Sequence, residues 1–263
     1  MFVFRMTKED RQSLILEQLL KQGSVLVSDL AEILDVSSVT IRKDLTELEK
    51  EGKLYRSHGK AIVINPFASN RSVNEKEKLF PEEKQGIGRE AAKLITRDDS
   101  IIIGSGTTMH ALAGQIRPIH RLTVVAASLQ VSEILAQNDS IDIIQLGGMV
   151  RHSSLSVVGQ YCDAILQDCS FTKLFLGVDG IDFDFGFTTT DIREAELNRK
   201  MMHVAQKTII LADSSKFGRR GFAKIGNIED IDVIITDTKI PSPIVREIEE
   251  LGIELIVAGA KLL

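Results

Sequence analysis

The stretch VSDLAEILDVSSVTIRKDLTELEKEGKLYRSHGKAIVI, residues 27–64, decides the fold of the N-terminal part of the chain. Its beginning predicts a short helix, with Ser28 placed to cap it and Asp29 in its first turn. Apolar residues recur on one face of this helix: Leu30, Ala31 and Leu34. The polar segment Asp35-Val36-Ser37 then breaks the helix, so a second helix is expected to begin directly after it.

The second helix has a buried stripe and a polar beginning. Ile41, Leu45 and Leu48 are spaced i, i+4 and i+7. Four residues at its start are left exposed: Ser38, Thr40, Arg42 and Lys43. Two short helices joined by a tight turn, the second with small polar and cationic side chains at its start, are typical of a helix-turn-helix that reads DNA. A generic three-helix bundle with a solvated polar face is the alternative.

A small basic hairpin is expected after these helices. Gly52 is placed to end the second helix. The segments 54–56 and 61–64 then predict two short strands joined across Ser57-His58-Gly59-Lys60. Such a hairpin would form the wing of a winged helix-turn-helix.

The residue string narrows the choice between these two interpretations. Ser38-Val39-Thr40-Ile41-Arg42-Lys43-Asp44-Leu45, followed by Leu48-Glu49, Gly52 and a basic hairpin, resembles the winged helix-turn-helix of the DeoR family of bacterial repressors. The resemblance implies binding to double-stranded operator DNA. The expected contacts are Ser38, Thr40, Arg42 and Lys43 in the major groove, and Arg56, His58 and Lys60 on the backbone or in an adjacent groove.

The charge distribution predicts an oligomer. The net charge is −5, yet residues 1–64 carry ten Lys/Arg and ten Asp/Glu, so the acidic excess lies in the rest of the chain. Within residues 38–60, six basic residues stand against four acidic ones, which can occupy the side away from the groove. A single DNA-binding domain would make few phosphate contacts and would bind DNA weakly. Helix-turn-helix proteins commonly dimerise on repeated half-sites, so we expect a homo-oligomer, either a dimer or a tetramer.

Length and composition predict a two-domain soluble protein. The 263 residues divide into a DNA-binding domain at 1–64, a linker at 65–80 and an α/β domain at 81–263. The apolar segment 1–6 is too short for a signal peptide or a membrane span. Cys162 and Cys169 lack a CxxC spacing, which favours two buried thiols in a reducing cytoplasm over a disulfide or a metal site. We expect a cytoplasmic protein with no cofactor, no metal and no membrane contact.

Periodicity predicts the remaining elements. A first helix runs from about Thr7 to Gln22, with Leu16, Leu19 and Leu20 on its apolar face and Gly23 at its end. After the polar segment 65–72, a charged stretch passes into a helix that ends near Ile95. The strands expected beyond it are Ser100–Ile103, Leu122–Ala126, Ile141–Leu146, Leu174–Val178, Thr208–Ala212, Val233–Thr236 and Glu254–Val257. The helices expected are Met109–Ile116, Leu129–Gln137, Tyr161–Leu166, Ile192–Gln206 and Pro243–Leu251.

Short apolar strands that alternate with helices predict a mostly parallel sheet covered on both faces. Ligands of such sheets bind beyond the carboxyl ends of the strands. Several expected strand ends are rich in glycine, hydroxyl and charged residues: Gly104-Ser105-Gly106-Thr107-Thr108, Ala127-Ser128, Gly147-Gly148 with Arg151, residues 177–182, residues 186–190 and residues 213–218. Each alone is more often an ordinary turn. Together they suit a small polyhydroxylated anion, with cations and amides for phosphate and carboxylates for sugar hydroxyls.

The effector site expected from this pattern comprises Ser105, Gly106, Thr107, Thr108, Ser128, Gly147, Gly148, Arg151, Asp179, Glu194 and Lys216. The same motifs, in order, look like the sensor domain of the DeoR family, so the resemblance covers residues 8–258. It implies a repressor of sugar-use operons, a phosphorylated sugar as effector and a sensor fold similar to ribose-5-phosphate isomerase. The chain departs from many members at Gly104, where they have aspartate, and at Ala127, where asparagine is frequent.

Two other functions remain open at this point. An isomerase with an appended DNA-binding domain could use Asp179, Asp182 or Glu194 as base. It would also need the lysine-glycine run that the isomerase carries after its acidic loop, where residues 183–187 here contain no lysine. The second open function is that of a DNA-binding scaffold whose pocket is vestigial and binds no effector. We expect an allosteric repressor with no catalytic residue.

Overall fold

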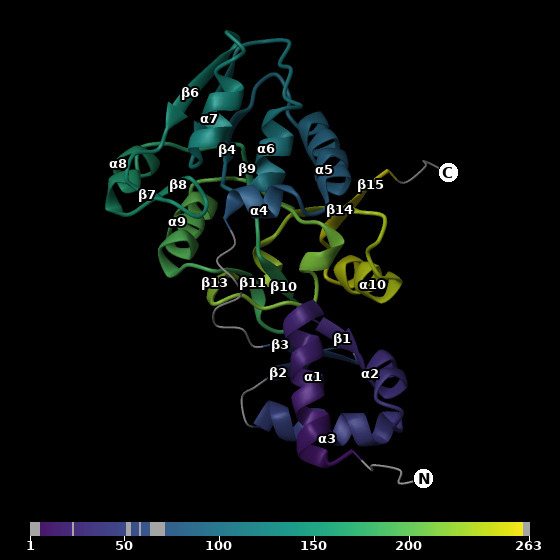
Figure 1. Ribbon diagram of the computed structural model, residues 1–263. Helices are drawn as coiled ribbons and strands as arrows, with labels where there is room; N and C mark the ends of the chain where they lie inside the picture. The colour runs from purple at the N-terminus through teal and green to yellow at the C-terminus, as the bar shows by residue number, and fades with distance from the viewer. Residues whose placement is uncertain (1–5, 23, 51–53, 58, 64–71, 260–263) are drawn as a thin grey trace.

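The computed structural model describes residues 6–22, 24–50, 54–57, 59–63 and 72–259. An N-terminal head and a larger α/β body are visible in Figure 1. The head has its own cluster of buried apolar side chains, drawn from residues 15–61. Two further clusters lie in the body. The expected domain limits at residues 64 and 80 stay a prediction.

Within its described residues, the head contains three helices and a three-stranded sheet. They are α1 (Lys8–Gln22), β1 (Ser24–Leu26), α2 (Val27–Ile33), α3 (Ser38–Lys50), β2 (Leu54–Ser57) and β3 (Lys60–Val63). The strand order is β1-β3-β2, and both pairings are antiparallel. The predicted stripe of Ile41, Leu45 and Leu48 is fully buried, which confirms the pattern assigned to α3.

The start of α2 differs from the prediction. Because β1 runs to Leu26, the helix begins at Val27 and its N-cap is Leu26, which makes no side-chain capping bond. Ser28 therefore lies inside the first turn, and its hydroxyl donates to Asp29 instead of capping the helix. Some of the predicted features lie outside the described residues. They are the helix ends at Gly23 and Gly52, the strand end at Ile64, the wing residue His58 and the side chain of Leu20.

The body is organised on a seven-stranded sheet in the order β15-β14-β12-β9-β4-β5-β6. All of its pairings are parallel. The strands are β4 (Ser100–Ile103), β5 (Leu122–Ala126), β6 (Ile141–Gln145), β9 (Lys173–Gly177), β12 (Thr208–Leu211), β14 (Val233–Asp237) and β15 (Glu254–Ala258). All seven predicted strands are confirmed, with ends within one residue, and the mostly parallel α/β fold is confirmed with them.

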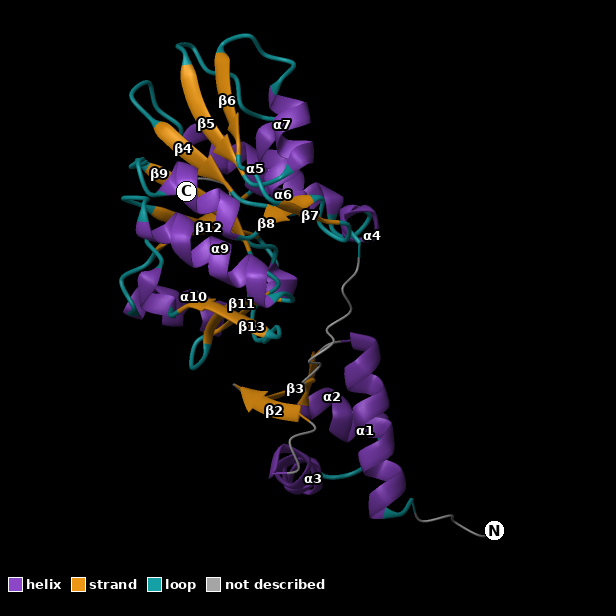
Figure 2. Cartoon of the chain, turned by 90° about the vertical axis from the view of Figure 1, so that its left-hand side faces the viewer, coloured by secondary structure: helices purple, strands orange, loops and turns teal. Residues whose placement is uncertain are grey.

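Helices cover both faces of the sheet, as Figure 2 shows. On one face, Ile101 and Ile103 of β4 pack with α5 (Pro81–Lys93), α6 (Thr107–Ala113) and α7 (Leu129–Leu135). On the other, Ile102 belongs to the cluster that includes α8 (Asp163–Leu166), α9 (Ile192–His203) and α10 (Ser242–Glu250). The alternation along β4 is the two-residue period of a strand buried on both sides.

Several short elements were not expected. They are α4 (Val73–Glu77), β7 (Met149–Arg151), β8 (Ser156–Val158), β10 (Gly180–Asp182), β11 (Gly186–Thr189) and β13 (Ala223–Gly226), with the 3-10 turns η1 (Gln160–Cys162), η2 (Ser214–Lys216) and η3 (Ile228–Asp230). β7 and β8 form an antiparallel pair, and β10, β11 and β13 form a small antiparallel sheet. Unlike the seven strands of the large sheet, these elements carry no run of apolar residues from which they could be predicted. The expected helix at Tyr161–Leu166 is η1 followed by α8, and α6, α7 and α9 each end two or three residues before their predicted ends.

The cysteine prediction is half right. Cys162 is buried, but Cys169 is exposed, because it lies in the loop between α8 and β9 rather than on a packed face. Both thiols are free.

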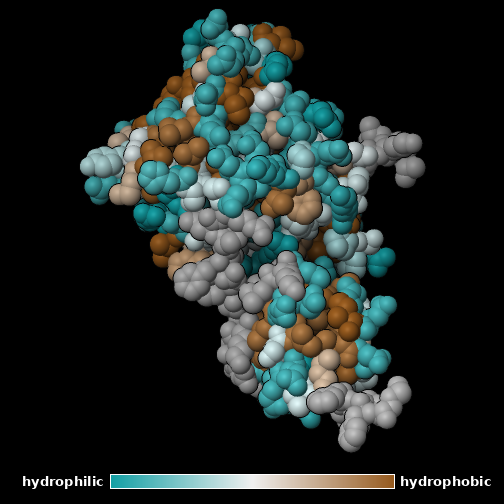
Figure 3. Space-filling model, viewed as in Figure 1, coloured by the Kyte–Doolittle hydropathy of each residue, from teal (hydrophilic) through white to brown (hydrophobic). Residues whose placement is uncertain are grey.

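None of the helices in the described part of the chain is both long and apolar enough to cross a bilayer. Brown apolar patches remain on the surface of both head and body in Figure 3; Ile33 and Val39 of the head are 52% and 71% exposed.

Candidate functional site

The beginning of α3 presents the predicted DNA-reading residues. Ser38, Arg42 and Lys43 are exposed. Thr40 is half-buried, and its backbone N–H donates to Ser37 Oγ at 3.2 Å, so Ser37 caps the helix. The exposed Val39 was not among the predicted contacts. Val39 is 71% exposed and stands between polar residues at the beginning of α3.

The acidic residues Asp44, Glu47 and Glu49 of α3 pair with basic residues of the head itself. Asp44 is buried and accepts from Arg11 Nη2 at 3.0 Å. Glu49 accepts from the guanidinium of Arg56 at 2.8 Å, so this wing residue is tied to α3 while keeping an exposed surface. Lys60 is half-buried at the start of β3. These pairings leave the positive charges of α3 on the surface of the head.

In the body, the loops after β4 and β9 meet at the carboxyl edge of the sheet. Gly106 is the N-cap of α6 with φ at +112°, a conformation that favours glycine, and a side chain there would meet nothing within 4 Å. Thr107 and Thr108 follow it in the first turn and are each 8% exposed. The backbone at Gly106 is therefore open to a ligand on one side.

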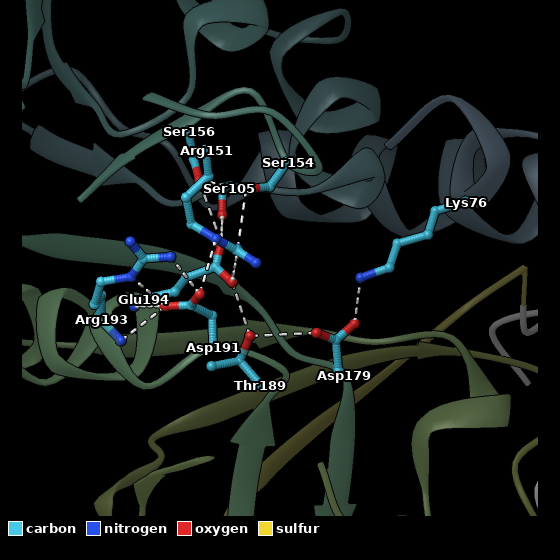
Figure 4. Close-up of polar contacts among 10 residues, drawn as sticks. All are labelled: Lys76, Ser105, Arg151, Ser154, Ser156, Asp179, Thr189, Asp191, Arg193 and Glu194. Atoms are coloured by element: carbon cyan, nitrogen blue, oxygen red, sulfur yellow. Dashed lines mark hydrogen bonds and ion pairs between the residues drawn. The ribbon is translucent and has the colours of Figure 1, made fainter. Parts of the chain in front are cut away.

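Glu194 is the centre of a hydrogen-bond network at this edge (Figure 4). It lies at the start of α9 and is 7% exposed. Four side chains donate to its carboxylate: Ser105 at 2.8 Å, Arg151 at 2.7 Å, Thr189 at 2.9 Å and Ser156 at 3.3 Å. These donors come from four separate segments, so the network holds the loops of the edge together.

Arg151 is buried and lies between two carboxylates. Its Nε is 3.3 Å from Asp191 Oδ2, in addition to its bond to Glu194. Asp191 also pairs with Arg193 at 2.8 Å. The hydrogen bond from Arg193, with the charge of Arg151, lowers the pKa of Asp191 to about 2. The positive charge expected here for phosphate is thus balanced within the protein, and a ligand role for Arg151 stays a prediction.

Asp179 is the second charged centre of the edge. Lys76 donates to its Oδ1 at 2.7 Å and Thr189 to its Oδ2 at 3.2 Å. Burial acts to raise the pKa of this carboxyl, but the charges of Lys76 and Lys216 outweigh it and lower the pKa to about 2. Burial lowers the pKa of Lys216, against the opposite effect of Asp179 and Asp213. Asp179 is therefore a carboxylate held between two cations.

The remaining predicted residues have structural contacts. Ser128 is fully buried and caps α7, accepting from the backbone N–H of Val131 at 3.4 Å. Gly148 has φ at +150°, and a side chain there would come within 2.6 Å of the carbonyl oxygen of Val158. The carbonyl of Gly147 accepts from the thiol of Cys162. Whether these three also contact an effector stays a prediction.

The network includes residues that were not predicted as site residues: Lys76, Ser156, Thr189, Asp191 and Arg193. Thr189 was within a quoted motif, but the other four carried no signal, because their partners are distant in the sequence. In the part of the chain that the structure describes, no group of three His, Cys, Asp or Glu side chains could hold a metal ion.

A buried lysine adjoins the site. Lys84 of α5 is 6% exposed and donates to the carbonyl oxygens of Lys76 and Leu79, both at 2.6 Å. Burial lowers its pKa to about 8, although Asp213 favours the charged form.

This lysine predicts a pH dependence. Between pH 8 and 10.5 the unfolded chain still binds the Lys84 proton while the folded protein has released it, so this group adds stability as pH rises. The difference in unfolding free energy between wild type and Lys84→Met should increase in favour of wild type by about 1 kcal/mol per pH unit in this window. Urea unfolding at several pH values measures it. Lys93→Met, an exposed change on the same helix, is the control, and a difference for Lys84→Met that does not vary with pH contradicts the prediction.

Comparison with known families covers both parts of the chain. The DeoR-like helix-turn-helix domain matches residues 11–67, and the DeoR C terminal sensor domain matches residues 80–238. The chain belongs to the DeoR family. As a member with the helix-turn-helix domain, it is a DNA-binding transcriptional regulator.

Relatives of this DeoR-family protein align over most of their length. HTH-type transcriptional regulator YulB of Bacillus subtilis (strain 168) is 35% identical, covering 94% of this chain and 95% of that protein. The lactose phosphotransferase system repressor of Streptococcus mutans is 34% identical, covering 88% and 93%. The glycerol-3-phosphate regulon repressor of Haemophilus influenzae is 29% identical, covering 95% and 97%.

Solved structures resemble this DeoR-family protein more remotely. Ribose 5-phosphate isomerase A of Neisseria gonorrhoeae is 17% identical with a TM-score of 0.36, and the match covers 52% of this chain and 53% of the isomerase. The sorbitol operon regulator SorC of Klebsiella pneumoniae is 12% identical with a TM-score of 0.36, covering 81% of this chain and 91% of SorC.

Proposed function

We propose that this DeoR-family protein represses a carbohydrate-utilisation operon, and that a phosphorylated sugar or polyol bound at the carboxyl edge of the body sheet controls its affinity for operator DNA. The observation that carries the proposal is the combination of an exposed basic beginning of α3 with a separate network of hydroxyls, carboxylates and cations around Glu194 and Asp179. Relatives named as repressors of a lactose phosphotransferase system and of a glycerol-3-phosphate regulon support the substrate class.

The effector would bind through the groups that line this edge. Hydroxyls of a sugar or polyol suit the carboxylate of Asp179 and the side chain of Thr189. A phosphate suits the open backbone at Gly106, the adjacent threonine hydroxyls and the ammonium of Lys216. Binding that changes operator affinity 5- to 150-fold requires a coupling free energy of about 1–3 kcal/mol.

The same contacts argue for a regulator without isomerase activity. A general base near neutral pH needs a pKa close to that range. Asp179 has a pKa of about 2. Glu194 accepts from four donors, and the buried Asp182 accepts from Arg220 at 2.7 Å. Each of the three candidate bases therefore already has at least one carboxylate oxygen bound by donors of the protein itself.

Operator recognition would take two or more copies of the chain, because one head offers few phosphate contacts. The proposal therefore includes a homo-oligomer that acts on double-stranded DNA in the cytoplasm. Sedimentation of the purified protein, alone and with a DNA duplex, measures the number of copies. A monomer that binds its operator tightly would contradict this part of the proposal.

A thermal-shift screen tests the effector class. The purified protein is heated with a panel of sugar and polyol phosphates, with the unphosphorylated sugars and inorganic phosphate as controls. A ligand at 100 times its dissociation constant should stabilise the fold by about 2.7 kcal/mol. A shift confined to phosphorylated sugars or polyols supports the proposal, and the absence of any shift across the panel contradicts it.

The contribution of Lys216 has its own test. Lys216→Ala should weaken the effector found in the screen by about tenfold or more, because a charge-assisted bond to phosphate is lost. The control is Lys207→Ala. Lys207 has a side chain that is 40% exposed and lies directly before β12, whereas Lys216 lies beyond the carboxyl end of that strand. Calorimetry measures both dissociation constants. An unchanged value for Lys216→Ala would remove this lysine from the site.

A further inference from the structure

The helix α4 links the segment before it to the proposed effector site at the carboxyl edge of the sheet. We call this site the effector edge; it comprises Ser105, Arg151, Asp179, Thr189 and Glu194. It begins directly after residues 64–71, which connect the head to the body, and Ser72 caps it in a capping box with Glu75. The backbone N–H of Val73 donates to the carbonyl of Ser153 at 2.6 Å, in the turn between β7 and β8. The first described residues after the connection are therefore attached to the hairpin that carries Arg151.

Lys76 attaches α4 to the effector edge itself. Figure 4 shows its side chain reaching from the helix to Asp179, with the 2.7 Å ion pair between them. The Lys76 side chain is 27% exposed and the Asp179 side chain 19%. Thr189 contacts both Asp179 and Glu194, so the helix, Asp179 and the Glu194 network form one continuous series of hydrogen bonds.

The position of α4 depends on such contacts because the helix has only five residues. Helices of this length do not persist on their own in water. Apart from the bonds of Val73 and Lys76, α4 is held by three further contacts. Val73 is buried, Lys84 donates to the carbonyl of Lys76 in the helix and to that of Leu79 just beyond it, and Glu77 lies 3.8 Å from His110. Of these contacts, the one made by Lys76 reaches a residue of the predicted effector site.

We propose that Lys76 is the residue through which the effector edge controls the connection to the DNA-binding head. While Asp179 holds its ammonium, α4 stays fixed on the body and the connecting segment starts from a fixed point. A ligand whose phosphate attracts Lys76, or whose hydroxyls bind Asp179, changes the strength of this pair and so the freedom of α4. This inference rests on the proposed function and names the residue that transmits the signal.

The first experiment needs no effector. Hydrogen exchange of residues 73–79 is measured in the full-length wild type and in Lys76→Met, which keeps the length of the side chain and removes its charge. Exchange should become about tenfold faster in Lys76→Met, because a hydrogen bond between charged groups that anchors the helix is lost. Lys78→Met, on an exposed lysine next to α4, is the matched control and should exchange like wild type. Lys76→Arg should restore slow exchange.

The second experiment asks whether the helix controls DNA binding. The probe is a set of duplexes selected by the wild-type protein from random sequence. Without any sugar phosphate, Lys76→Met should change the dissociation constant for these duplexes by at least about fivefold, whereas Lys78→Met and Lys76→Arg should not. Unchanged exchange in Lys76→Met overturns the proposal. Faster exchange with unchanged DNA affinity overturns it as well, since α4 would then be freed without consequence for the head.

The third experiment separates this inference from the proposed function. With the panel compound that most stabilises the wild type, operator affinity should change in the wild type and stay constant in Lys76→Met. An equal response in both proteins overturns the role of Lys76 while leaving the effector class intact. If no compound stabilises the wild type, the effector class fails, and the two ligand-free experiments still decide the role of Lys76.

Discussion

Glu194→Ala is expected to cost about 3 kcal/mol of unfolding free energy, because it leaves a buried arginine with half of its compensating charge. Arg151 is 7% exposed and would keep only Asp191, at 3.3 Å. The hydroxyls of Ser105, Ser156 and Thr189 would lose Glu194 as an acceptor at the same time, although Thr189 can still donate to Asp179. The destabilisation should be measurable by urea unfolding of the purified protein.

A matched control lies two residues further along the same helix. Glu196 is 58% exposed and pairs with Lys200 one turn away, at 3.0 Å. Exposed pairs of this kind contribute below about 1 kcal/mol, so Glu196→Ala should change stability little. A loss for Glu194→Ala no greater than for Glu196→Ala would show that the network around Arg151 does not hold the loops of the effector edge together.

Arg42→Ala is expected to abolish specific DNA binding and to leave effector binding intact. A base contact by an arginine contributes about 1–3 kcal/mol, and two heads acting together would lose roughly twice that, which corresponds to about 30- to 25,000-fold in affinity. The folded head should survive, because Arg42 is exposed and the buried residues of α3 are unchanged. Fluorescence anisotropy with selected duplexes measures DNA binding, and calorimetry measures the effector.

The control for this change is Arg89→Ala, which removes the same charge from an exposed position on α5 of the body. It should leave DNA affinity within about twofold of wild type. If Arg42→Ala impaired both DNA and effector binding, or neither, the division of labour between head and body would be wrong. A loss that is equal for all DNA sequences, with a smaller salt dependence, would assign Arg42 to phosphate rather than to a base.

The elements that could be predicted from the sequence are those whose own residues carry a clear pattern. Each of the seven body strands is a run of apolar residues bounded by glycine, polar or charged residues, so its limits follow from local composition. The stripe of Ile41, Leu45 and Leu48 identified α3 in the same way. Because parallel strands share one carboxyl edge, the meeting of Ser105, Arg151 and Glu194 could be predicted as well, while their role in effector binding stays a prediction.

The short elements could not be predicted, because their conformation depends on partners elsewhere in the chain. β13 is a strand through its pairing with β11, and β1 through its pairing with β3. Ser28 was expected to cap α2, but β1 ends at Leu26, which is the N-cap, so the helix starts two residues earlier than expected. A three-residue strand has no period of its own to reveal it.

The sequence by itself determined the helix-turn-helix, the limits of the seven parallel strands and the chemical character of the loops at their carboxyl ends. Only the tertiary structure decided which charges meet there. Arg151 and Glu194 are 43 positions apart, and Lys76 and Asp179 are 103 apart. Ion pairs depend on distance in space, which local composition does not encode. For this reason the sequence did not reveal that Lys76, which lies in an ordinary charged stretch, is the contact between α4 and Asp179.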